Sequence, residues 1–186
     1  VEGPARVLLH DPMSRENAER AAAEFGAKIA REFGVDTVGV AFTAMDNLEA
    51  AVRASRIVIT ATRSTRPLVR KEWVAPGTHF SCIGADAPGK EEIDPALFGG
   101  ARVFADDIDQ CVRVGEMEIP VGQGVIVRGD GAGEIGELSA GTKRGRETDG
   151  DITIFDATGL ALLDLAVAKT VIEAARAKGI GLAADM

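Results

Sequence analysis

Short apolar runs alternate along the chain with segments in which apolar residues recur every three or four positions. Runs rich in apolar and β-branched residues predict buried strands at 6–10, 37–42, 56–61, 79–83, 102–105 and 152–155. The segments between and after them predict helices between Ser14 and Gly34, at 46–55, around 68–73, near 94–95, up to about 114, at 134–140 and at 160–177. This alternation predicts an α/β fold with a doubly wound, mainly parallel sheet.

The first and last helices have the clearest signals. Ser14 can cap the first helix and Gly34 fits its end. Its apolar residues are spaced for one buried face, which comprises Ala18, Ala22, Phe25, Ile29 and Phe33. The last helix stops at Gly179 and is apolar on more than one face. We therefore expect that helix to be deeply buried or to lie in an interface.

Between 115 and 150 the pattern weakens into a glycine-rich stretch that contains one short helix at 134–140. A loop this long inside a compact domain is either functional or mobile. No residue of the stretch has a spacing that indicates particular chemistry.

Composition limits the class of protein. A length of 186 residues suffices for one sizeable core, and the 21 basic against 29 acidic residues give a net charge of −8. This charge argues against a nucleic-acid or anionic-membrane surface. No apolar run is long enough to cross a bilayer and the first residues lack a signal-peptide pattern, which predicts a soluble, cytoplasmic protein.

Few side chains are suited to redox or metal chemistry. Cys82 and Cys111 are too few for a disulfide scaffold or a metal site, so each is expected to be a small buried residue. His10 and His79 are isolated in the sequence, which favours structural roles. Asp106 and Asp107 are adjacent, but without a nearby ligand one of them is expected to cap the following helix. No metal site is predicted.

Candidate chemistry gathers directly after the strand at 79–83. The loop there has Gly84 and Gly89 for close backbone approach, with Asp86 and Lys90 as one carboxylate and one ammonium group. Ligands of parallel sheets bind outside the carboxyl ends of the strands, so this loop is well placed for a site. The alternative is a solvated turn whose two charges face water.

Two motifs resemble those of a known family. Residues 84–92, Gly-Ala-Asp-Ala-Pro-Gly-Lys-Glu-Glu, resemble the Gly-Ala-Asp-x-Pro-Gly-Lys-x-Glu segment of the ornithine cyclodeaminase/mu-crystallin family. Residues 155–161, Phe-Asp-Ala-Thr-Gly-Leu-Ala, are similar to the matching turn of its archaeal-type alanine dehydrogenases. The resemblance implies a Rossmann-like domain that binds a nicotinamide cofactor, in an enzyme acting on a small amino acid or its imine. It also implies that Asp86 is the catalytic acid/base residue beside the substrate nitrogen.

The family accommodates three functions. One is net redox, in which hydride passes between the nicotinamide and the carbon bearing the nitrogen, as in alanine dehydrogenase or an imine reductase. The second is ornithine cyclodeamination, with hydride taken and returned, and the third is non-catalytic NAD(P)H binding as in crystallins. Similarity at 156–164 favours net redox, and the carboxylate at Asp86 favours an enzyme over a binding protein.

Asp11 is the candidate for cofactor selection. An acidic residue at the end of an early strand of such a fold hydrogen-bonds the adenosine ribose of NAD, although Asp11 could simply end its strand before Pro12. Aspartate here favours NAD, while the nearby Arg15 leaves NADP possible. The resemblance implies that the cofactor-binding residues are Asp11, Thr62, Ser64, Gly84, Ala85, Lys90, Thr158 and Gly159.

Several of these residues have a structural alternative. The hydroxyls around Thr62 and Ser64 could cap the helix at 68–73, and Thr158 is a plausible cap for the last helix. Lys90 could orient its loop, pair with Asp86 or contact the cofactor.

The expected dinucleotide fingerprint is missing upstream of Asp11. Only residues 1–4 precede the first strand, and Gly3 alone cannot form the glycine-rich phosphate turn. The resemblance thus implies that the first strand, the phosphate loop and an N-terminal substrate and oligomerisation domain are absent. We expect an incomplete Rossmann-type domain at 1–155 and a helix at 156–186 that packs toward the absent part, with a homodimer at full length.

Overall fold

The computed structural model describes residues 6–182, so Gly3 and the outer ends of both expected domains lie outside it. Strands in the described part are β1 (Arg6–Leu9), β2 (Ala41–Ala44), β3 (Ile57–Thr60), β4 (Thr65–Val69), β5 (His79–Cys82), β6 (Glu91–Ile93), β7 (Ala101–Ala105), β8 (Gly133–Glu134) and β9 (Ile152–Asp156). The main sheet has the order β3-β5-β9-β7-β8, and β1-β2 and β4-β6 form two-stranded sheets. Every pairing is parallel, which confirms the mainly parallel α/β fold.

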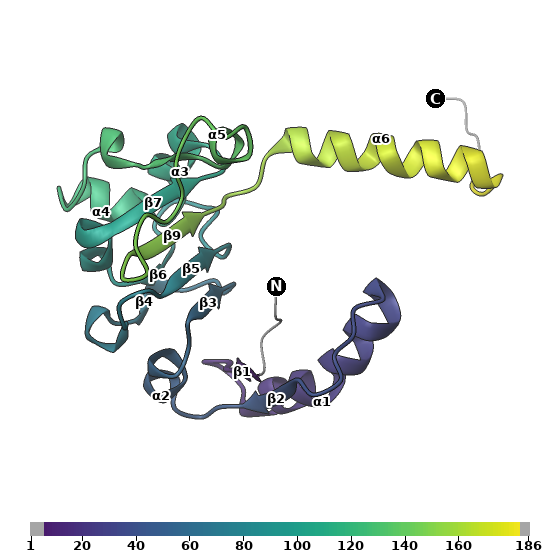
Figure 1. Ribbon diagram of the computed structural model, residues 1–186, viewed down its shortest axis with the longest axis horizontal. Helices are drawn as coiled ribbons and strands as arrows, with labels where there is room; N and C mark the ends of the chain where they lie inside the picture. Colours follow the sequence, from purple (N-terminus) through teal and green to yellow (C-terminus); the bar gives the residue numbers. More distant parts are fainter. Residues whose placement is uncertain (1–5, 183–186) are drawn as a thin grey trace.

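Helices connect and flank these strands (Figure 1). The α-helices are α1 (Arg15–Phe33), α2 (Leu48–Arg53), α3 (Ile108–Val114), α4 (Glu118–Gly122), α5 (Ile135–Ser139) and α6 (Ala161–Lys178). Three short 3₁₀ helices are η1 (Lys71–Trp73), η2 (Pro95–Gly100) and η3 (Arg128–Asp130). Asp107 caps α3 by accepting the Gln110 N–H at 2.8 Å, as the sequence predicted for one of the paired aspartates.

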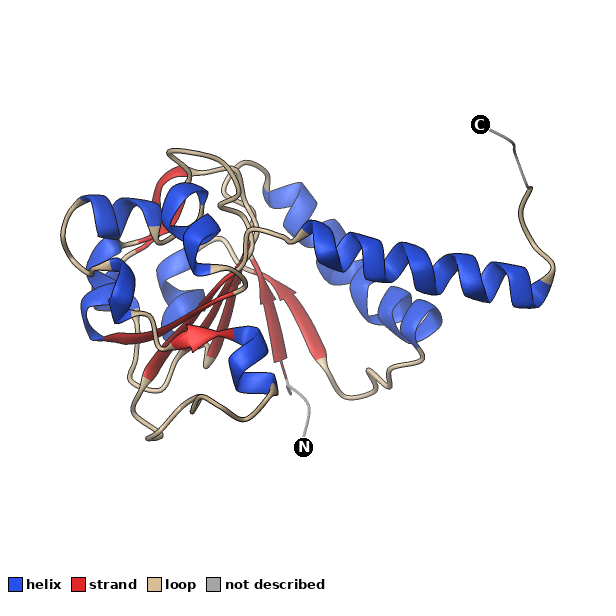
Figure 2. Ribbon diagram, turned by 90° about the horizontal axis from the view of Figure 1, so that it is seen from above, coloured by secondary structure: helices blue, strands red, loops and turns tan. Residues whose placement is uncertain are grey.

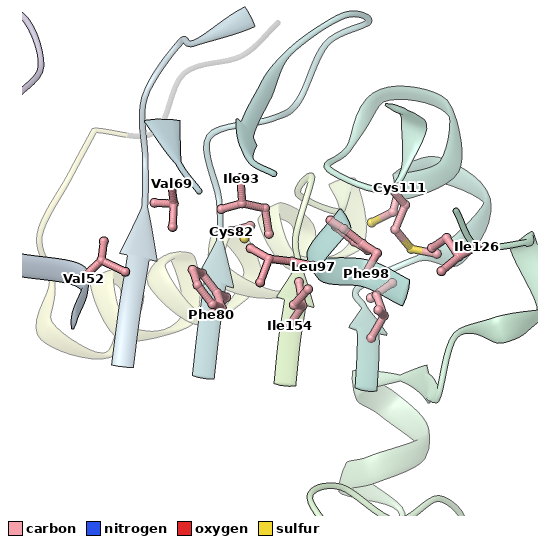
Figure 3. Packing of buried hydrophobic residues seen from close by; sticks show 13 residues of the cluster. Val52, Val69, Phe80, Cys82, Ile93, Leu97, Phe98, Cys111, Ile126 and Ile154 are labelled. Atoms are coloured by element: carbon pink, nitrogen blue, oxygen red, sulfur yellow. The ribbon is translucent and has the colours of Figure 1, made fainter. Parts of the chain in front are cut away.

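The hydrophobic core lies on one face of the main sheet (Figure 3). Phe80 of β5 and Ile154 of β9 are fully buried, and Leu97 and Phe98 of η2 pack against the same cluster. Burying each such side chain contributes about 1.5–3 kcal/mol, so this cluster is the main source of stability for the sheet. Cys82 and Cys111 belong to the cluster as small buried residues, as predicted.

Helix α1 has the predicted ends but not the predicted buried face. The Ser14 hydroxyl accepts the Asn17 N–H, and Gly34 ends the helix in the left-handed conformation with φ 65°. Of the expected face only Ala18 is buried, whereas Phe25 and Phe33 are exposed. The reason is that the spacing identifies an apolar stripe, while burial also needs a partner surface.

Helix α6 extends away from the main sheet (Figures 1 and 2). Its large apolar residues are at least half exposed, and they comprise Leu162, Leu163, Leu165, Val167, Val171 and Ile172. The expectation of deep burial is therefore wrong for the described residues, and the interface alternative stays a prediction. Across residues 6–182, no helix combines the length and the apolar character that crossing a bilayer requires.

Several predicted segments differ from the structure. The run at 56–61, predicted as a buried strand, is the edge strand β3, in which Ile57 and Ile59 are more than half exposed. The second strand is Ala41–Ala44 rather than 37–42. The expected helix at 68–73 is instead β4 followed by the single turn η1, because β4 pairs with β6, a strand that the sequence did not predict. The stretch 115–150 contains α4, η3 and β8 besides the predicted short helix, observed at Ile135–Ser139.

One cavity lies between the small β1-β2 sheet and the main sheet. It has a volume of about 440 Å³ and is lined from both sides, by Leu8, His10 and Asp11 of the first segment and by residues 57–62 of the second. In the described residues, β1 pairs only with β2 and β3 pairs only with β5, so the other edge of each strand is open. These open strand edges belong to the two segments that line the cavity.

Candidate functional site at the carboxyl edge of the sheet

Four loops follow the carboxyl ends of neighbouring parallel strands. They come after β3, β5, β7 and β9, which are adjacent in the main sheet. This edge is where α/β proteins bind ligands. Apart from Asp11, every predicted site residue lies on one of these loops.

Asp86 and Lys90 form an ion pair in the loop after β5. The Lys90 ammonium also donates a hydrogen bond to the Gly84 carbonyl at 3.3 Å. The bond and charge of Lys90 lower the pKa of Asp86, whose side chain is 56% exposed. Asp86 is therefore an accessible, ionised carboxylate at neutral pH, able to accept a proton or face a cation.

The glycine at position 84 is required by close packing. A Cβ atom there would overlap the buried Glu92 carboxylate and would lie 2.5 Å from the Thr62 carbonyl oxygen. Ala85 is buried beside it, with 1% of its surface exposed. The backbone after β5 thus lies directly against the loop after β3.

The loop after β3 is fixed by its own hydroxyls and by Glu92. The Thr62 N–H donates to Glu92 Oε1 at 2.5 Å, and the Thr62 hydroxyl accepts the Ser64 N–H at 3.1 Å. The Ser64 hydroxyl donates to the Arg66 carbonyl at 2.6 Å. A helix-capping role is therefore wrong for both hydroxyls, because the segment continues as β4.

Asp11 lies at the end of β1 and lines the cavity between the two sheets. Its carboxylate accepts the N–H groups of Met13 at 2.8 Å and Ser14 at 3.1 Å, and the Asn17 side-chain amide at 3.0 Å. The hydrogen bond from Met13, followed by that from Asn17, lowers the pKa of Asp11. The nearby Arg15 is paired with Glu19 and Asp46, each at 2.6 Å.

Thr158 and Gly159 form the turn between β9 and α6. The Asp106 carboxylate accepts the N–H of Thr158 at 2.9 Å and of Gly159 at 2.7 Å. The Thr158 hydroxyl accepts the Gln110 side-chain amide at 2.7 Å. Thr158 does not cap α6, because the residue at the N-cap is Leu160.

Sequence reasoning missed a set of buried carboxylates beneath this edge. Glu92 and Asp156 are fully buried, Glu116 is 1% exposed and Asp106 is 8% exposed. Burial raises the pKa of Glu116 to about 8 and that of Asp156 to about 7. Glu92 could have been noticed as the last residue of the 84–92 motif. Asp106 is one of the paired aspartates and Asp156 lies in the 155–161 motif, but nothing local indicates their burial, and Glu116 has no local signal because its partners are distant in sequence.

A cavity of about 550 Å³ is lined by residues such as Ile57, His79 and Phe155 and contains none of the predicted site residues. Within residues 6–182 no three metal-ligating side chains come together. His10 and His79 have structural partners, namely the Met45 carbonyl at 2.8 Å and the Thr153 hydroxyl at 2.7 Å.

A parallel sheet whose predicted site residues gather on loops at its carboxyl edge is the arrangement of a Rossmann-type α/β domain. Residues 15–179 match the model of the ornithine cyclodeaminase/mu-crystallin family, and the chain belongs to that family.

Individual relatives agree with this assignment. Over 137 residues the chain is 47% identical to an alanine dehydrogenase of Archaeoglobus fulgidus, covering 73% of this chain and 42% of that protein. Over 143 residues it is 41% identical to an iminosuccinate reductase of Paracoccus denitrificans, covering 77% of this chain and 44% of that protein. It superposes on an archaeal alanine dehydrogenase dimer with bound NAD at a TM-score of 0.83 and 39% identity. The superposition covers 97% of this chain and 52% of the chain in that structure. The chain thus spans about half the length of the relatives it matches.

Proposed function

We propose that the protein carrying this chain is an NAD(H)-dependent oxidoreductase that interconverts a small amino acid with its imino or keto acid. The observation that carries the proposal is the accessible Asp86 carboxylate, kept ionised by Lys90 at the carboxyl edge of the sheet. Similarity to an alanine dehydrogenase and an iminosuccinate reductase supports the same class of substrate.

The residues present fit a nicotinamide dinucleotide. The 440 Å³ cavity lies within the range of about 300–1,000 Å³ typical of ligand pockets. Asp11 on its lining is an ionised acceptor suited to ribose hydroxyl groups, and Thr62 and Glu92 line the same cavity. When bound, the nicotinamide supplies or accepts the hydride. We assign the ribose to Asp11 and the remaining contacts to the loops at Thr62, Gly84 and Thr158.

Asp86 has the protonation state that the reaction needs. Oxidising an amine requires a base that takes the proton of the nitrogen, or of the water that attacks the iminium carbon. An ionised carboxylate performs this step and also stabilises the positive charge of the iminium group. The hydrogen bond from Lys90 orients the carboxylate, and because it lowers the pKa it keeps Asp86 ionised at neutral pH while making it a weaker base than a free carboxylate.

NADH consumption by the intact protein tests the proposal. Pyruvate, oxaloacetate and glyoxylate, each with ammonia, form the screen, and we expect at least one of them to support turnover. Asp86→Asn should lower kcat by about 10²–10⁴-fold, as for a lost general acid/base, and should leave NADH binding intact. Glu49→Gln is the matched control, because Glu49 forms an exposed ion pair of the same spacing with Arg53 in α2.

Ornithine cyclodeamination is the alternative that this screen must separate. Proline and ammonia produced from ornithine, with no net change in NADH, would replace the dehydrogenase assignment. An Asp86→Asn variant with normal turnover would contradict both chemistries, because each of them relies on this carboxylate.

We also propose that α6 is covered in the intact protein and that the protein is a homodimer. The support is the row of exposed apolar residues along α6, which is unusual for a helix in contact with water. Light scattering of the intact protein should give twice the mass of one chain. A monomer would contradict the dimer.

A further inference from the structure

We propose that Glu92 is a positioning residue whose buried carboxylate fixes the loops after β3 and β5 against each other, and so places Asp86 and Lys90. The proposal rests on the proposed function for its kinetic consequences. Its structural part, the fixing of the two loops, stands on the geometry alone.

Glu92 lies where the two loops meet. Its carboxylate is fully buried, and Oε1 accepts the Thr62 N–H at 2.5 Å. Oε2 lies against the Cα of Gly84, so close that no Cβ fits there, and receives no hydrogen bond within residues 6–182. One carboxylate therefore contacts the β3 loop through a hydrogen bond and the β5 loop through van der Waals packing.

Gly84 transmits this contact to the catalytic pair. Its carbonyl accepts a hydrogen bond from Lys90, whose ammonium also pairs with Asp86. Gly84 is thus in contact with Glu92 at its Cα and with Lys90 at its carbonyl. A shift of the Glu92 carboxylate would move Gly84 and, with it, the base and its partner.

Glu92 is itself fixed from below. The Glu116 carboxylate accepts the N–H of Glu92 at 2.7 Å and that of Ile93 at 3.4 Å. Asp156 in turn accepts the N–H of Met117, the residue after Glu116, at 2.9 Å. Glu116 therefore holds the backbone of Glu92 in place, and Asp156 holds the backbone next to Glu116. The side chain of Glu92 thus projects from a constrained backbone.

The motif at 84–92 gains a physical explanation from this arrangement. Its first residue, Gly84, and its last, Glu92, touch each other, and its cation, Lys90, donates to the first. The motif is therefore a closed loop that presents Asp86.

Three variants separate the reach of the side chain from its carboxyl group in the intact protein. Glu92→Gln keeps the reach and an acceptor for the Thr62 N–H, so we expect near-normal kinetics. Glu92→Asp keeps the carboxyl group but is one methylene too short, and Glu92→Ala has neither. Both should lower kcat/KM by about 10²-fold, as expected when reacting groups shift by about 1 Å. The loss should appear as a lower kcat together with a higher KM for NADH.

Hydrogen exchange at the Thr62 amide provides a readout that does not need activity. Exchange should accelerate by about 10–100-fold in Glu92→Asp and Glu92→Ala, the range expected when a buried N–H loses its acceptor, and stay slow in Glu92→Gln. Leu97→Ala is the control for a general loss of stability, since it removes a fully buried core side chain outside the loops. It should lower Tm and leave the Thr62 exchange and both kinetic constants unchanged.

The outcomes distinguish this proposal from the proposed function. In one outcome the wild-type protein oxidises NADH with an imino acid, while Glu92→Asp has the same Thr62 exchange rate and kinetic constants as Leu97→Ala. That result overturns the positioning role alone. Selective acceleration at Thr62 in a protein inactive on every imino acid retains the loop-fixing role and overturns the function. A Glu92→Asp variant with normal kinetics beside an impaired Glu92→Gln would also overturn the proposal, because the carboxyl group rather than the reach of the side chain would then matter.

Discussion

The Asp106 carboxylate accepts the backbone N–H of Gly159 at 2.7 Å, across 53 positions of sequence. The same oxygen, Oδ2, accepts the Thr158 N–H at 2.9 Å, while the Cys111 thiol donates to Oδ1 at 3.2 Å. One acid at the end of β7 therefore sets the conformation of the turn that leads from β9 into α6.

Asp106→Ala should loosen this turn, because it leaves two backbone N–H groups without their acceptor. We expect a loss of about 1–3 kcal/mol in the free energy of unfolding, measured by urea denaturation. Asp106→Asn retains a carbonyl acceptor and should lose less. Equal stability of Asp106→Ala and the wild type would show that Thr158 and Gly159 find other partners.

Stability should fall as pH rises from about 4.5 to about 8. Burial raises the pKa of Glu116 from 4.5 to about 8, so in this range the folded protein retains a proton that the unfolded chain has released. The pKa of Asp156, which burial raises from 3.8 to about 7, changes the stability in the same direction. Urea denaturation at several pH values checks this, and Glu116→Gln should flatten the dependence. Parallel curves for the variant and the wild type would contradict the assignment to Glu116.

On the proposed function, the intact protein should prefer NADH over NADPH. Asp11 stays ionised because the Met13 N–H, and then Asn17, lower its pKa, and a 2′-phosphate beside it would meet a like charge. The ratio of kcat/KM for the two cofactors measures the preference. Asp11→Asn should reduce that ratio by about tenfold or more. A wild-type preference for NADPH would refute this, and would indicate Arg15 as the phosphate partner.

Both cysteines should be unreactive in the folded protein. Cys82 and Cys111 are at most 1% exposed, and burial raises the pKa of each thiol, so almost no thiolate is available at pH 8. A chromogenic disulfide reagent should label neither residue until guanidinium unfolds the chain, and then label both. Rapid labelling of one thiol before unfolding would place that residue at the surface.

Strands β3, β5, β7 and β9 of the main sheet were predictable because each is a short run of apolar or β-branched residues. The run at 56–61 differs from β3 by one residue at each end. Strand β6 was missed because two of its three residues are glutamates, and Glu92 is accommodated in the interior only by distant partners. Strand β4 was predicted as helix since its conformation depends on pairing with β6.

The candidate site was predictable in part. Asp86 and Lys90 are four residues apart in one loop, so their pairing was among the alternatives that the sequence allowed. The contact of Asp106 with Gly159 was not predictable, since no local pattern relates two residues 53 positions apart. The resemblance to the family located the loops, and only the three-dimensional arrangement indicated which acids support them.

Strands β1 and β2 form a sheet separate from the main sheet, and this separation predicts which part of the chain unfolds first. Residues 6–44 contribute no side chain to the main hydrophobic cluster, and α1 buries only Ala18. A segment with so few buried contacts opens locally at low free energy. A protease should therefore cleave this chain first near residues 34–40, between α1 and β2, while the segment from β3 to β9 resists digestion. Asp11, to which we assign the ribose, would be lost with the first fragment, and the Asp86 loop would stay folded.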